Sequence, residues 1–391
     1  MKNKSKFVSL LFSGLFLGLL LSSSSLTLTQ AQDEAPLDPP YGHVKDGRAP
    51  RRPRLPRATH HNDVEAVIAN QSSVKSQLSR GTCSIFSATA LLESMLLINK
   101  KADKSIDLSE EYLEYLVNHD SFGDGSSSYR NFDAFFSYGT ANEIEFGYIG
   151  ETWKKGDYTS YVKGEERCGR FEKNENSEIF DRCLVVHRDP RLLDKDDTLL
   201  EKEGGEFYDP EFLKARTSAE KFKEEYMDPS SNHDAYRVDV TEAKNLLDKG
   251  IPLTLDLDFY YGAWNHRLAA TLGMTRNMQN WDLGIVGYPE KGSLDLINSN
   301  SPEERAGHSI VVVGYDDKVK LEIETEMVDK TKKKSTYTGV YYFKNSWGTD
   351  KLGSQFKIKD KNGKEIPHPG YAMITQKYAE EFGVFFKLPL K

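Results

Sequence analysis

Cys83 lies where a reactive thiol would be expected. It follows Gln77 by six residues and begins a segment in which apolar residues recur at helical spacing: Ile85, Ala88, Leu92, Met95 and Leu96. Thr82 is a suitable N-cap for this helix. Backbone N–H groups and the helix dipole at the first turn favour a thiolate, so we expect a thiol pKa below about 8.5. The alternative is that Cys83 is a small core residue.

Two later segments could bring a histidine and an asparagine together. Residues 307–315 (GHSIVVVGY) predict a buried strand that starts near His308, and residues 340–348 (VYYFKNSWG) predict a strand that ends near Asn345. If these strands pair antiparallel as neighbours, the start of the first lies opposite the end of the second. We therefore expect the side chains of His308 and Asn345 to be in contact.

A Cys–His–Asn set has a definite chemistry. Cys83 would attack a carbonyl carbon as a thiolate, His308 would transfer protons, and Asn345 would orient the imidazole. Gln77 could donate a side-chain N–H to the developing oxyanion, together with the backbone N–H of Cys83. Trp347 would shield the His–Asn hydrogen bond from water; the alternative is that it is one more core indole.

At these residues the chain resembles the papain-like cysteine peptidases, the papain and cathepsin family. The matching motifs are the spacing from Gln77 to Cys83 with Phe-Ser-Ala after it, Gly-His-Ser at 307–309 and Asn-Ser-Trp-Gly at 345–348, in the family's chain order. Weaker similarity to the family's second helix, its glycine-bearing cleft wall and its next helix lies at residues 108–113, 122–125 and 134–139. The resemblance covers most of residues 77–387.

The resemblance implies an α+β, papain-like two-lobed fold. A helical left lobe would carry the nucleophile helix, and the right lobe would be an antiparallel, β-barrel-like sheet. It implies protein or peptide substrates and offers three candidates for substrate binding: Gly125, Ser309 and Trp347.

Three features depart from the family pattern. The tryptophan that usually follows the nucleophile is Ser84, and the cysteine that usually precedes it by three is Arg80, so one family disulfide cannot form. The separation of His308 and Asn345, 345 − 308 = 37 residues, exceeds that of the family's usual hairpin because residues 316–338 are inserted. Alternation of apolar and charged residues in this insertion predicts that both strands extend into a longer hairpin, capped by the lysines at 332–334.

Composition limits the classes of protein to consider. With 391 residues and 38% hydrophobic content, the chain can bury a substantial core, and one two-lobed domain with insertions fits as well as two domains. The expected peptidase domain is 62–391, with a helical lobe at about 77–150, an insertion at about 151–236 and a β-rich lobe at about 237–391. A diffuse net charge of −8 argues against nucleic acid as the principal partner. The sequence predicts no oligomeric state.

Residues 1–31 have the composition of a signal peptide. Lys2, Lys4 and Lys6 form a positive start, residues 7–21 are apolar, and a polar segment with small residues follows up to Ala31. We expect cleavage and export, to the secreted or periplasmic compartment, with a bacterial source favoured and no stable membrane insertion afterwards. An uncleaved anchor is the alternative.

The remaining cysteines, Cys168 and Cys183, are a natural disulfide pair for an exported protein. Closing this loop of about 15 residues would stabilise the fold by roughly 3 kcal/mol in the chain-entropy model. The alternatives are two free thiols or a metal clip, but only His187 accompanies them in the sequence, and a four-ligand zinc site needs more.

Two segments carry little pattern. Residues 32–61 combine five arginines at 48–57 with several prolines, which predicts an extended linker or short pro-segment and excludes a long helical propeptide. Residues 151–236 are charged and poor in branched apolar side chains, which predicts a surface insertion without a core of its own, with one or two helical turns at 221–226.

The C-terminal part predicts ordinary elements. Residues 240–247 predict a helix and residues 251–257 a strand that opens the β-rich lobe. The aromatic segment 260–264 and Trp281 are expected to pack in the core, with the cleft rim as the alternative. Asp-Lys-Asn-Gly-Lys at 360–364 predicts a hairpin turn in preference to a calcium loop. No metal or cofactor is expected.

The sequence therefore predicts an exported cysteine peptidase that hydrolyses peptide bonds through a thioester at Cys83, with His308 as general base and acid. Two alternatives stay open at this point: an acyl transferase of the transpeptidase or transglutaminase-like kind, and a non-catalytic homologue that binds peptides.

Overall fold

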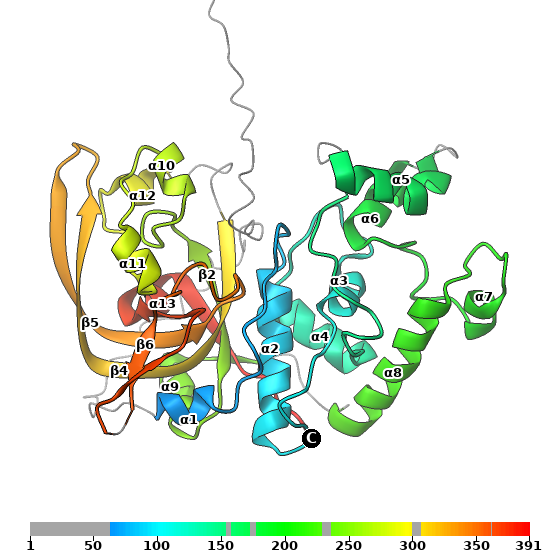
Figure 1. The fold of residues 1–391 in the computed structure, drawn as a ribbon, viewed down its shortest axis with the longest axis horizontal. Helices are drawn as coiled ribbons and strands as arrows, with labels where there is room; N and C mark the ends of the chain where they lie inside the picture. The colour runs from blue at the N-terminus through cyan, green and yellow to red at the C-terminus, as the bar shows by residue number, and fades with distance from the viewer. Residues whose placement is uncertain (1–62, 154–157, 173–176, 229–235, 299–305, 361) are drawn as a thin grey trace, which may run out of the picture. The chain divides into compact units, whose positions relative to one another are not determined.

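The computed structural model describes residues 63–153, 158–172, 177–228, 236–298, 306–360 and 362–391. The predicted signal peptide, residues 1–31, and the linker, residues 32–61, lie outside these ranges. Helices dominate up to residue 226 and strands dominate from residue 237, so the chain forms a helical lobe followed by a sheet lobe (Figure 1). The mixed α+β class expected from the sequence is confirmed.

The helices of the first half build the helical lobe, apart from α1. Their bounds are α1 Val64–Ile68, α2 Cys83–Ile98, α3 Glu110–Asn118, α4 Ser128–Tyr138, α5 Tyr158–Glu172, α6 Ser177–Val186, α7 Asp197–Glu201 and α8 Pro210–Tyr226. The later helices accompany the sheet: α9 Val240–Asp248, α10 Leu268–Thr271, α11 Met278–Asp282, α12 Leu294–Asn298 and α13 Gln376–Phe382.

Seven strands form the main sheet, in the order β1-β9-β2-β4-β5-β8-β3, and only the β3–β8 pair is parallel. Their bounds are β1 Arg237–Val238, β2 Leu253–Phe259, β3 Ile285–Val286, β4 Ala306–Glu326, β5 Lys332–Lys344, β8 Tyr371–Thr375 and β9 Gly383–Phe386. Strands β6 Lys357–Lys359 and β7 Glu365–Pro367 pair separately. The turn between them is the hairpin predicted at 360–364, in which Asp360 accepts from the backbone of Asn362 and Lys364.

The long hairpin is confirmed, but the lysines at 332–334, which were expected to cap it, are paired in β5, and the turn lies at 327–331. Strands β4 and β5 pair from Val311↔Lys344 to Glu326↔Lys332, and the register shifts between Val312 and Gly314 and between Asp316 and Lys320. Each shift adds residues to one strand, which bends the ribbon and increases its twist. Because the extra length lies at the closed end of the hairpin, the pairing at the open end is unchanged.

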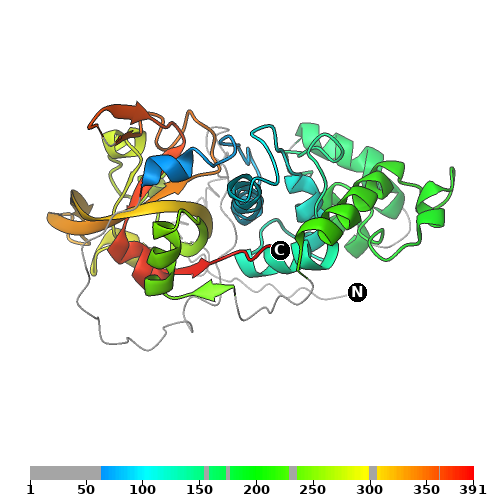
Figure 2. The ribbon, with the colours of Figure 1, turned by 90° about the horizontal axis from the view of Figure 1, so that it is seen from below.

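Helix α2 lies between the two lobes (Figures 1 and 2). Its expected apolar face, Ile85 to Leu96, packs in the helical core. Its other face is buried as well, because Ala90 packs against the cluster formed by α1 and the sheet. Because α2 is covered on all sides, its first turn is held in a fixed position. The same packing buries polar residues of the helix, such as Ser87 and Glu93.

The ends of the described chain cross between the lobes. Helix α1 precedes the helical lobe in sequence but packs on the sheet, where Val64, Val67 and Ile68 join Val311 and Val313. In the opposite direction, residues after β9 leave the sheet, and Leu388 joins the helical core. The amide of Lys391 then donates to the carbonyl of Tyr226 at the end of α8. These crossings attach each lobe to the other in addition to the contacts that α2 itself makes.

The insertion at 151–236 differs from the expectation. The described part of this segment contains four helices, α5 to α8, and α8 is a 17-residue helix where the sequence analysis expected a turn or two at 221–226. Phe212, Ala215 and Ala219 of α8 complete the helical core, and Gly139 has no room for a side chain because the carbonyl of Ala219 lies 1.9 Å from its would-be Cβ. The insertion therefore belongs to the helical lobe.

The predicted disulfide is present. Cys168 of α5 and Cys183 of α6 are bonded, and around them Trp153, Phe171, Phe180 and Leu184 form a small apolar cluster. This cluster corrects the expectation that the insertion lacks a core of its own. A disulfide helps such a small core, because it reduces the conformational entropy of the unfolded segment.

Candidate active site

Cys83 is the first residue of α2, is fully buried and takes part in no disulfide bond. The first intrahelical bond runs from the amide of Phe86 to the carbonyl of Thr82, so Thr82 is the N-cap residue as predicted. Its side chain, however, does not cap the helix. The Thr82 hydroxyl lies 2.7 Å from the hydroxyl of Tyr148 instead. The backbone N–H groups of the first turn therefore lack a side-chain cap from Thr82.

His308 and Asn345 are in contact, as the strand pairing predicts. His308 is the third residue of β4, Asn345 follows β5 directly, and Nε2 of His308 lies 2.9 Å from Oδ1 of Asn345. Because an amide oxygen only accepts, Nε2 carries the proton and Nδ1 keeps its lone pair. Nδ1 is buried and has no hydrogen-bond partner among the described residues. The hydrogen bond to Asn345 thus orients the imidazole of His308 and leaves Nδ1 able to accept a proton.

Aromatic rings enclose the imidazole of His308. The ring of Trp347 lies 4.8 Å from it, that of Trp264 5.1 Å and that of Phe259 5.7 Å, measured between centroids. Burial among these rings, together with the nearby His266, lowers the pKa of His308 to about 3, although the hydrogen bond that His308 donates to Asn345 opposes this. The resting imidazole is therefore neutral, and a charge on it requires a counter-charge close by.

Hydrogen bonds join the nucleophile helix to the histidine strand. The Ser87 hydroxyl, one turn after Cys83, lies 2.5 Å from the hydroxyl of Ser309, the residue after His308. Ser309 also bonds to the carboxylate of Asp256 on β2. Asp256 in turn accepts from the backbone and hydroxyl of Ser128 at the start of α4. This interlobe chain of hydrogen bonds attaches α2, one turn after Cys83, to the start of β4.

Gln77 is oriented by two partners. Its Oε1 accepts from the hydroxyl of Ser346 at 2.7 Å, and its Nε2 donates to the carbonyl of Arg80 at 2.8 Å. The amide of Gln77 also donates to the carbonyl of Ser346. The side-chain amide is thereby fixed with its nitrogen toward the loop that leads to Cys83. Because Ser346 follows Asn345, the two lobes share this contact.

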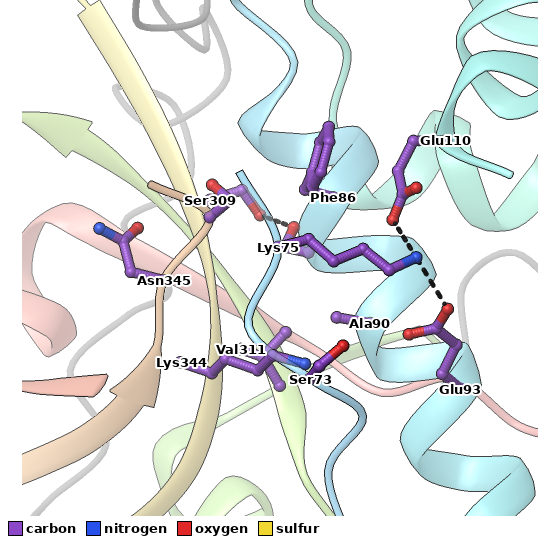
Figure 3. A pocket seen from close by; sticks show the side chains of 12 residues that line it. Ser73, Lys75, Phe86, Ala90, Glu93, Glu110, Ser309, Val311, Lys344 and Asn345 are labelled. Atoms are coloured by element: carbon purple, nitrogen blue, oxygen red, sulfur yellow. Dashed lines mark hydrogen bonds and ion pairs between the residues drawn. The ribbon is translucent and has the colours of Figure 1, made fainter. Parts of the chain in front are cut away.

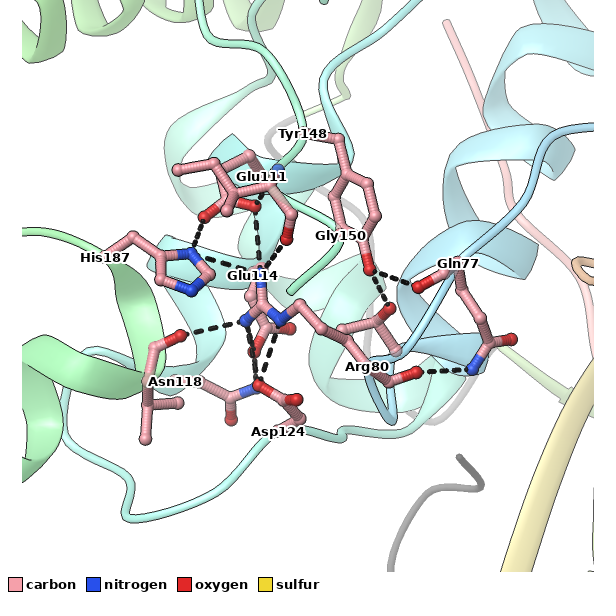
Figure 4. A network of polar contacts seen from close by, with 12 residues as sticks. Gln77, Arg80, Glu111, Glu114, Asn118, Asp124, Tyr148, Gly150 and His187 are labelled. Carbon is pink, nitrogen blue, oxygen red and sulfur yellow. Dashed lines mark hydrogen bonds and ion pairs between the residues drawn. The ribbon is translucent and has the colours of Figure 1, made fainter. Parts of the chain in front are cut away.

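Arg80 is the centre of a buried ionic cluster that the sequence analysis missed (Figure 4). Its side chain is fully buried and donates to Asp124 at 2.8 Å, Glu111 at 2.9 Å and Glu114 at 3.1 Å. It also donates to the carbonyls of Ile149 and Val185. In the resemblance to papain-like peptidases, Arg80 takes the place of a cysteine that forms a disulfide in that family. In this chain, the ion pairs of Arg80 attach the loop to the helical lobe.

The charges of this cluster are set by burial and by Arg80. Burial alone would raise the pKa of Glu111, but Arg80 and His187 outweigh it and lower that pKa below its usual value. Burial prevails at Glu114, whose pKa is raised well above the usual range although Arg80 opposes this. His187, which seemed isolated in the sequence, donates from Nδ1 to Glu111 at 2.7 Å.

A small cavity lies behind Asn345, between α2 and the strands β4 and β5 (Figure 3). Its volume of about 10 Å³ suits a single water molecule. Lys75 bridges Glu93 and Glu110 on its wall. Burial lowers the pKa of Lys344 on the same wall to about 8, opposed by Glu93, and Lys344 donates to Ser72. The cavity is too small for a substrate.

The substrate-binding candidates lie at different depths. Gly125 has a φ of +101° and follows Asp124, so it lies beside the loop before Cys83. Ser309 is buried and engaged in the interlobe chain, and Trp347 is buried against His308. A substrate contact of these three residues stays a prediction. The aromatic residues Tyr260, Tyr261, Trp264 and Trp281 are buried in the sheet core, as expected.

Among the residues that the structure describes, no group of three or more His, Cys, Asp or Glu side chains is placed to hold a metal ion. None of the described helices combines the length and the apolar character needed to cross a bilayer.

Comparisons with known proteins give similarity at the level of structure. No model of a protein family matches the sequence, and no curated protein matches it. Xylellain, a cysteine protease from Xylella fastidiosa, is 14% identical, with 92% of this chain and 97% of that chain covered and a TM-score of 0.45. The bromelain protease from Ananas comosus is 14% identical, with 85% and 100% covered and a TM-score of 0.39. Digestive procathepsin L 3 of Tenebrio molitor is 15% identical, with 88% and 77% covered and a TM-score of 0.37.

Proposed function

We propose that the protein is an exported cysteine peptidase of papain-like mechanism, with Cys83 as nucleophile, His308 as general base and acid, Asn345 as the residue that orients the imidazole, and Gln77 as an oxyanion donor. One observation carries the proposal: His308 donates from Nε2 to Asn345 while its buried Nδ1 keeps a lone pair, on the strand whose next residue, Ser309, bonds to α2 one turn after Cys83. A neutral, oriented imidazole is what nucleophilic catalysis by a nearby thiol requires.

Acylation begins with transfer of the Cys83 proton to Nδ1 of His308. Burial strongly disfavours an isolated imidazolium, so the charge forms only together with the thiolate. Two opposite charges about 4 Å apart attract by roughly 4 kcal/mol at an effective dielectric constant of 20. The N-terminus of α2 stabilises the thiolate, and Asn345 stabilises the imidazolium through Oδ1.

The thiolate then attacks the scissile carbonyl carbon and the C=O π electrons move to oxygen. The oxyanion would be held by Nε2 of Gln77 and by the backbone N–H of Cys83. The C–N bond breaks as His308 gives its proton to the departing amine, which leaves a thioester on Cys83. Water then attacks the thioester, His308 takes its proton, and the thiolate leaves.

Protein or peptide substrates follow from this chemistry. Export is proposed from the composition of residues 1–31, and the disulfide between Cys168 and Cys183 supports it, because disulfides persist in oxidising compartments.

The test uses the protein lacking residues 1–31. An epoxysuccinyl inhibitor of thiol proteases should give one covalent adduct, which peptide mapping by mass spectrometry places on Cys83, and casein should be cleaved. The Cys83→Ala variant is the matched control and should lack both. Casein cleavage together with incorporation of an added amine would indicate acyl transfer. Absence of any adduct on the folded wild-type protein would contradict the proposal.

A further inference from the structure

We propose that Tyr148 is a positioning residue for the oxyanion site, because its hydroxyl group connects both ends of the loop that runs from Gln77 to Cys83. This inference rests on the proposed function. Tyr148 follows α4 by ten residues and has no sequence pattern that points to the active site. Its role follows from where the fold places its hydroxyl.

The Tyr148 hydroxyl makes two hydrogen bonds (Figure 4). It donates to the carbonyl of Gln77 at 2.9 Å and lies 2.7 Å from the hydroxyl of Thr82. Because Tyr148 donates its only proton to Gln77, Thr82 donates to Tyr148. The Tyr148 hydroxyl thus holds Gln77, whose side chain is one proposed oxyanion donor. It also holds Thr82, which directly precedes Cys83, the residue whose backbone N–H is the other donor.

The ring of Tyr148 is itself held in place. Phe86 of α2 contacts it edge-on with centroids 4.8 Å apart, and the Arg80 guanidinium lies 5.7 Å from its centroid. The amide of Tyr148 donates to Glu143 at 2.7 Å. Burial raises the pKa of the Tyr148 hydroxyl well above its usual value, although Arg80 opposes this. The hydroxyl therefore stays protonated and bridges Gln77 and Thr82 through hydrogen bonds.

The same segment supports the middle of the loop. The carbonyl of Gly150 accepts from both the amide and the hydroxyl of Ser79, at 3.1 and 2.8 Å. A side chain at Gly150 would collide with Leu78, whose Cδ1 lies 2.2 Å from the would-be Cβ. Leu78 has a φ of +50°, a conformation that costs a branched residue energy and persists only where its surroundings impose it.

The consequence is specific to the transition state. An oxyanion donor must lie about 2.7–3.1 Å from the oxygen, so a loop that relaxes by a few tenths of an ångström weakens this interaction more than it weakens substrate binding. Thiolate formation depends on His308 and on the dipole of α2. The hydrogen-bond partners of the Tyr148 hydroxyl among the described residues are Gln77 and Thr82, and the Thr82 side chain does not cap α2, so loss of the hydroxyl leaves His308 and the dipole in place. Loss of the hydroxyl should therefore lower kcat and leave thiol reactivity intact.

The experiment compares Tyr148→Phe with wild type on a fluorogenic peptide chosen from a library for cleavage by the wild-type protein. We expect kcat to fall on the order of tenfold, less than for loss of a whole donor, with KM changed by less than about twofold. The rate and pH profile of Cys83 alkylation by iodoacetamide should match wild type. In a Gln77→Ala background the same substitution should have a smaller fractional effect on kcat, because one of the two donors that it positions is gone.

Tyr115→Phe is the matched control. The Tyr115 hydroxyl also makes one donated and one accepted bond, to the carbonyl of Asp189 and from the amide of Leu192, outside the loop. It should lower the melting temperature and leave kcat unchanged. If Tyr148→Phe does not fold, Thr82→Val removes the hydroxyl that bonds to Tyr148. This variant should show the same fall in kcat with KM and thiol reactivity unchanged.

Two results would overturn the inference: wild-type kcat in Tyr148→Phe, or an equal fractional loss with and without Gln77. Failure of the wild-type protein to react with the inhibitor would instead contradict the proposed function. The two failures are therefore distinguishable.

Discussion

Replacing Arg80 by methionine should destabilise the protein and impair the loop before the nucleophile at the same time. The substitution keeps an unbranched side chain but removes the cation that Asp124, Glu111 and Glu114 share. Removing one partner of a buried ion pair typically lowers the free energy of unfolding by about 3–5 kcal/mol, since the opposite charge stays buried without its partner. With an unfolding entropy of about 2.1 cal/mol/K per residue over roughly 300 residues, about 4 kcal/mol corresponds to a melting temperature lower by about 6 °C.

The pH dependence identifies the cause. In the wild type, Arg80 helps to keep the pKa of Glu111 low against burial. Without Arg80, burial should raise that pKa above its value in the unfolded chain, so the folded variant binds a proton more readily than the unfolded variant. Stability of the variant should then rise, relative to wild type, as the pH falls from about 7.5 to about 5. Urea unfolding at both pH values measures the difference.

A control within the helical lobe separates stability from activity. Arg188 is also buried and pairs with Asp209 and Glu211, but it lies outside the loop. Arg188→Met should lower the melting temperature without changing kcat, whereas Arg80→Met should lower both. A variant at Arg80 with wild-type stability at neutral pH, or with a stability deficit that grows at acid pH, would refute the reasoning.

Two further predictions concern pH and redox state. Because the pKa of His308 is about 3 in the folded protein against an ordinary value of 6.5, only the unfolded chain gains a proton between these values, so stability falls as the pH falls through that window. Urea unfolding should show that the loss between about pH 7 and pH 5 is smaller by roughly 2 kcal/mol in His308→Gln; an equal loss would contradict this. Reduction of the disulfide between Cys168 and Cys183, which are 15 residues apart, should lower stability by roughly 3 kcal/mol, while kcat stays within about twofold of wild type. Thermal melting and peptide assays in reductant test this, with Cys168→Ser/Cys183→Ser as the genetic equivalent, and a large loss of kcat would show that the loop depends on the disulfide.

Local sequence patterns predict the elements that carry the proposed site. Helical spacing after Cys83 predicts α2, and two apolar strand patterns predict that His308 and Asn345 meet, which the distance of 2.9 Å confirms. Each of these inferences needs only a few neighbouring residues and the geometry of one hairpin. The longer hairpin and the disulfide are predictable for the same reason.

Helix α8 was missed although its signal is present. Asp209 caps it, Pro210 is at its first position, and apolar residues follow at 212, 215, 219 and 222. The high charge of the surrounding segment obscured this spacing. The expectation of only one or two helical turns at 221–226 is therefore wrong, since capping and periodicity together predict the whole helix.

The sequence by itself determines which residues can do chemistry here: a thiol at a helix start, a histidine and an asparagine at the ends of paired strands, and a glutamine nearby. The tertiary structure alone decides what holds them. Arg80 meets Glu111 and Asp124 across 31 and 44 residues, Asp256 meets Ser128 across 128, and Tyr148 reaches Gln77 across 71. Such contacts leave no periodic trace in the sequence, because a charged or hydroxyl side chain has many possible partners until packing of the two lobes buries it beside one of them.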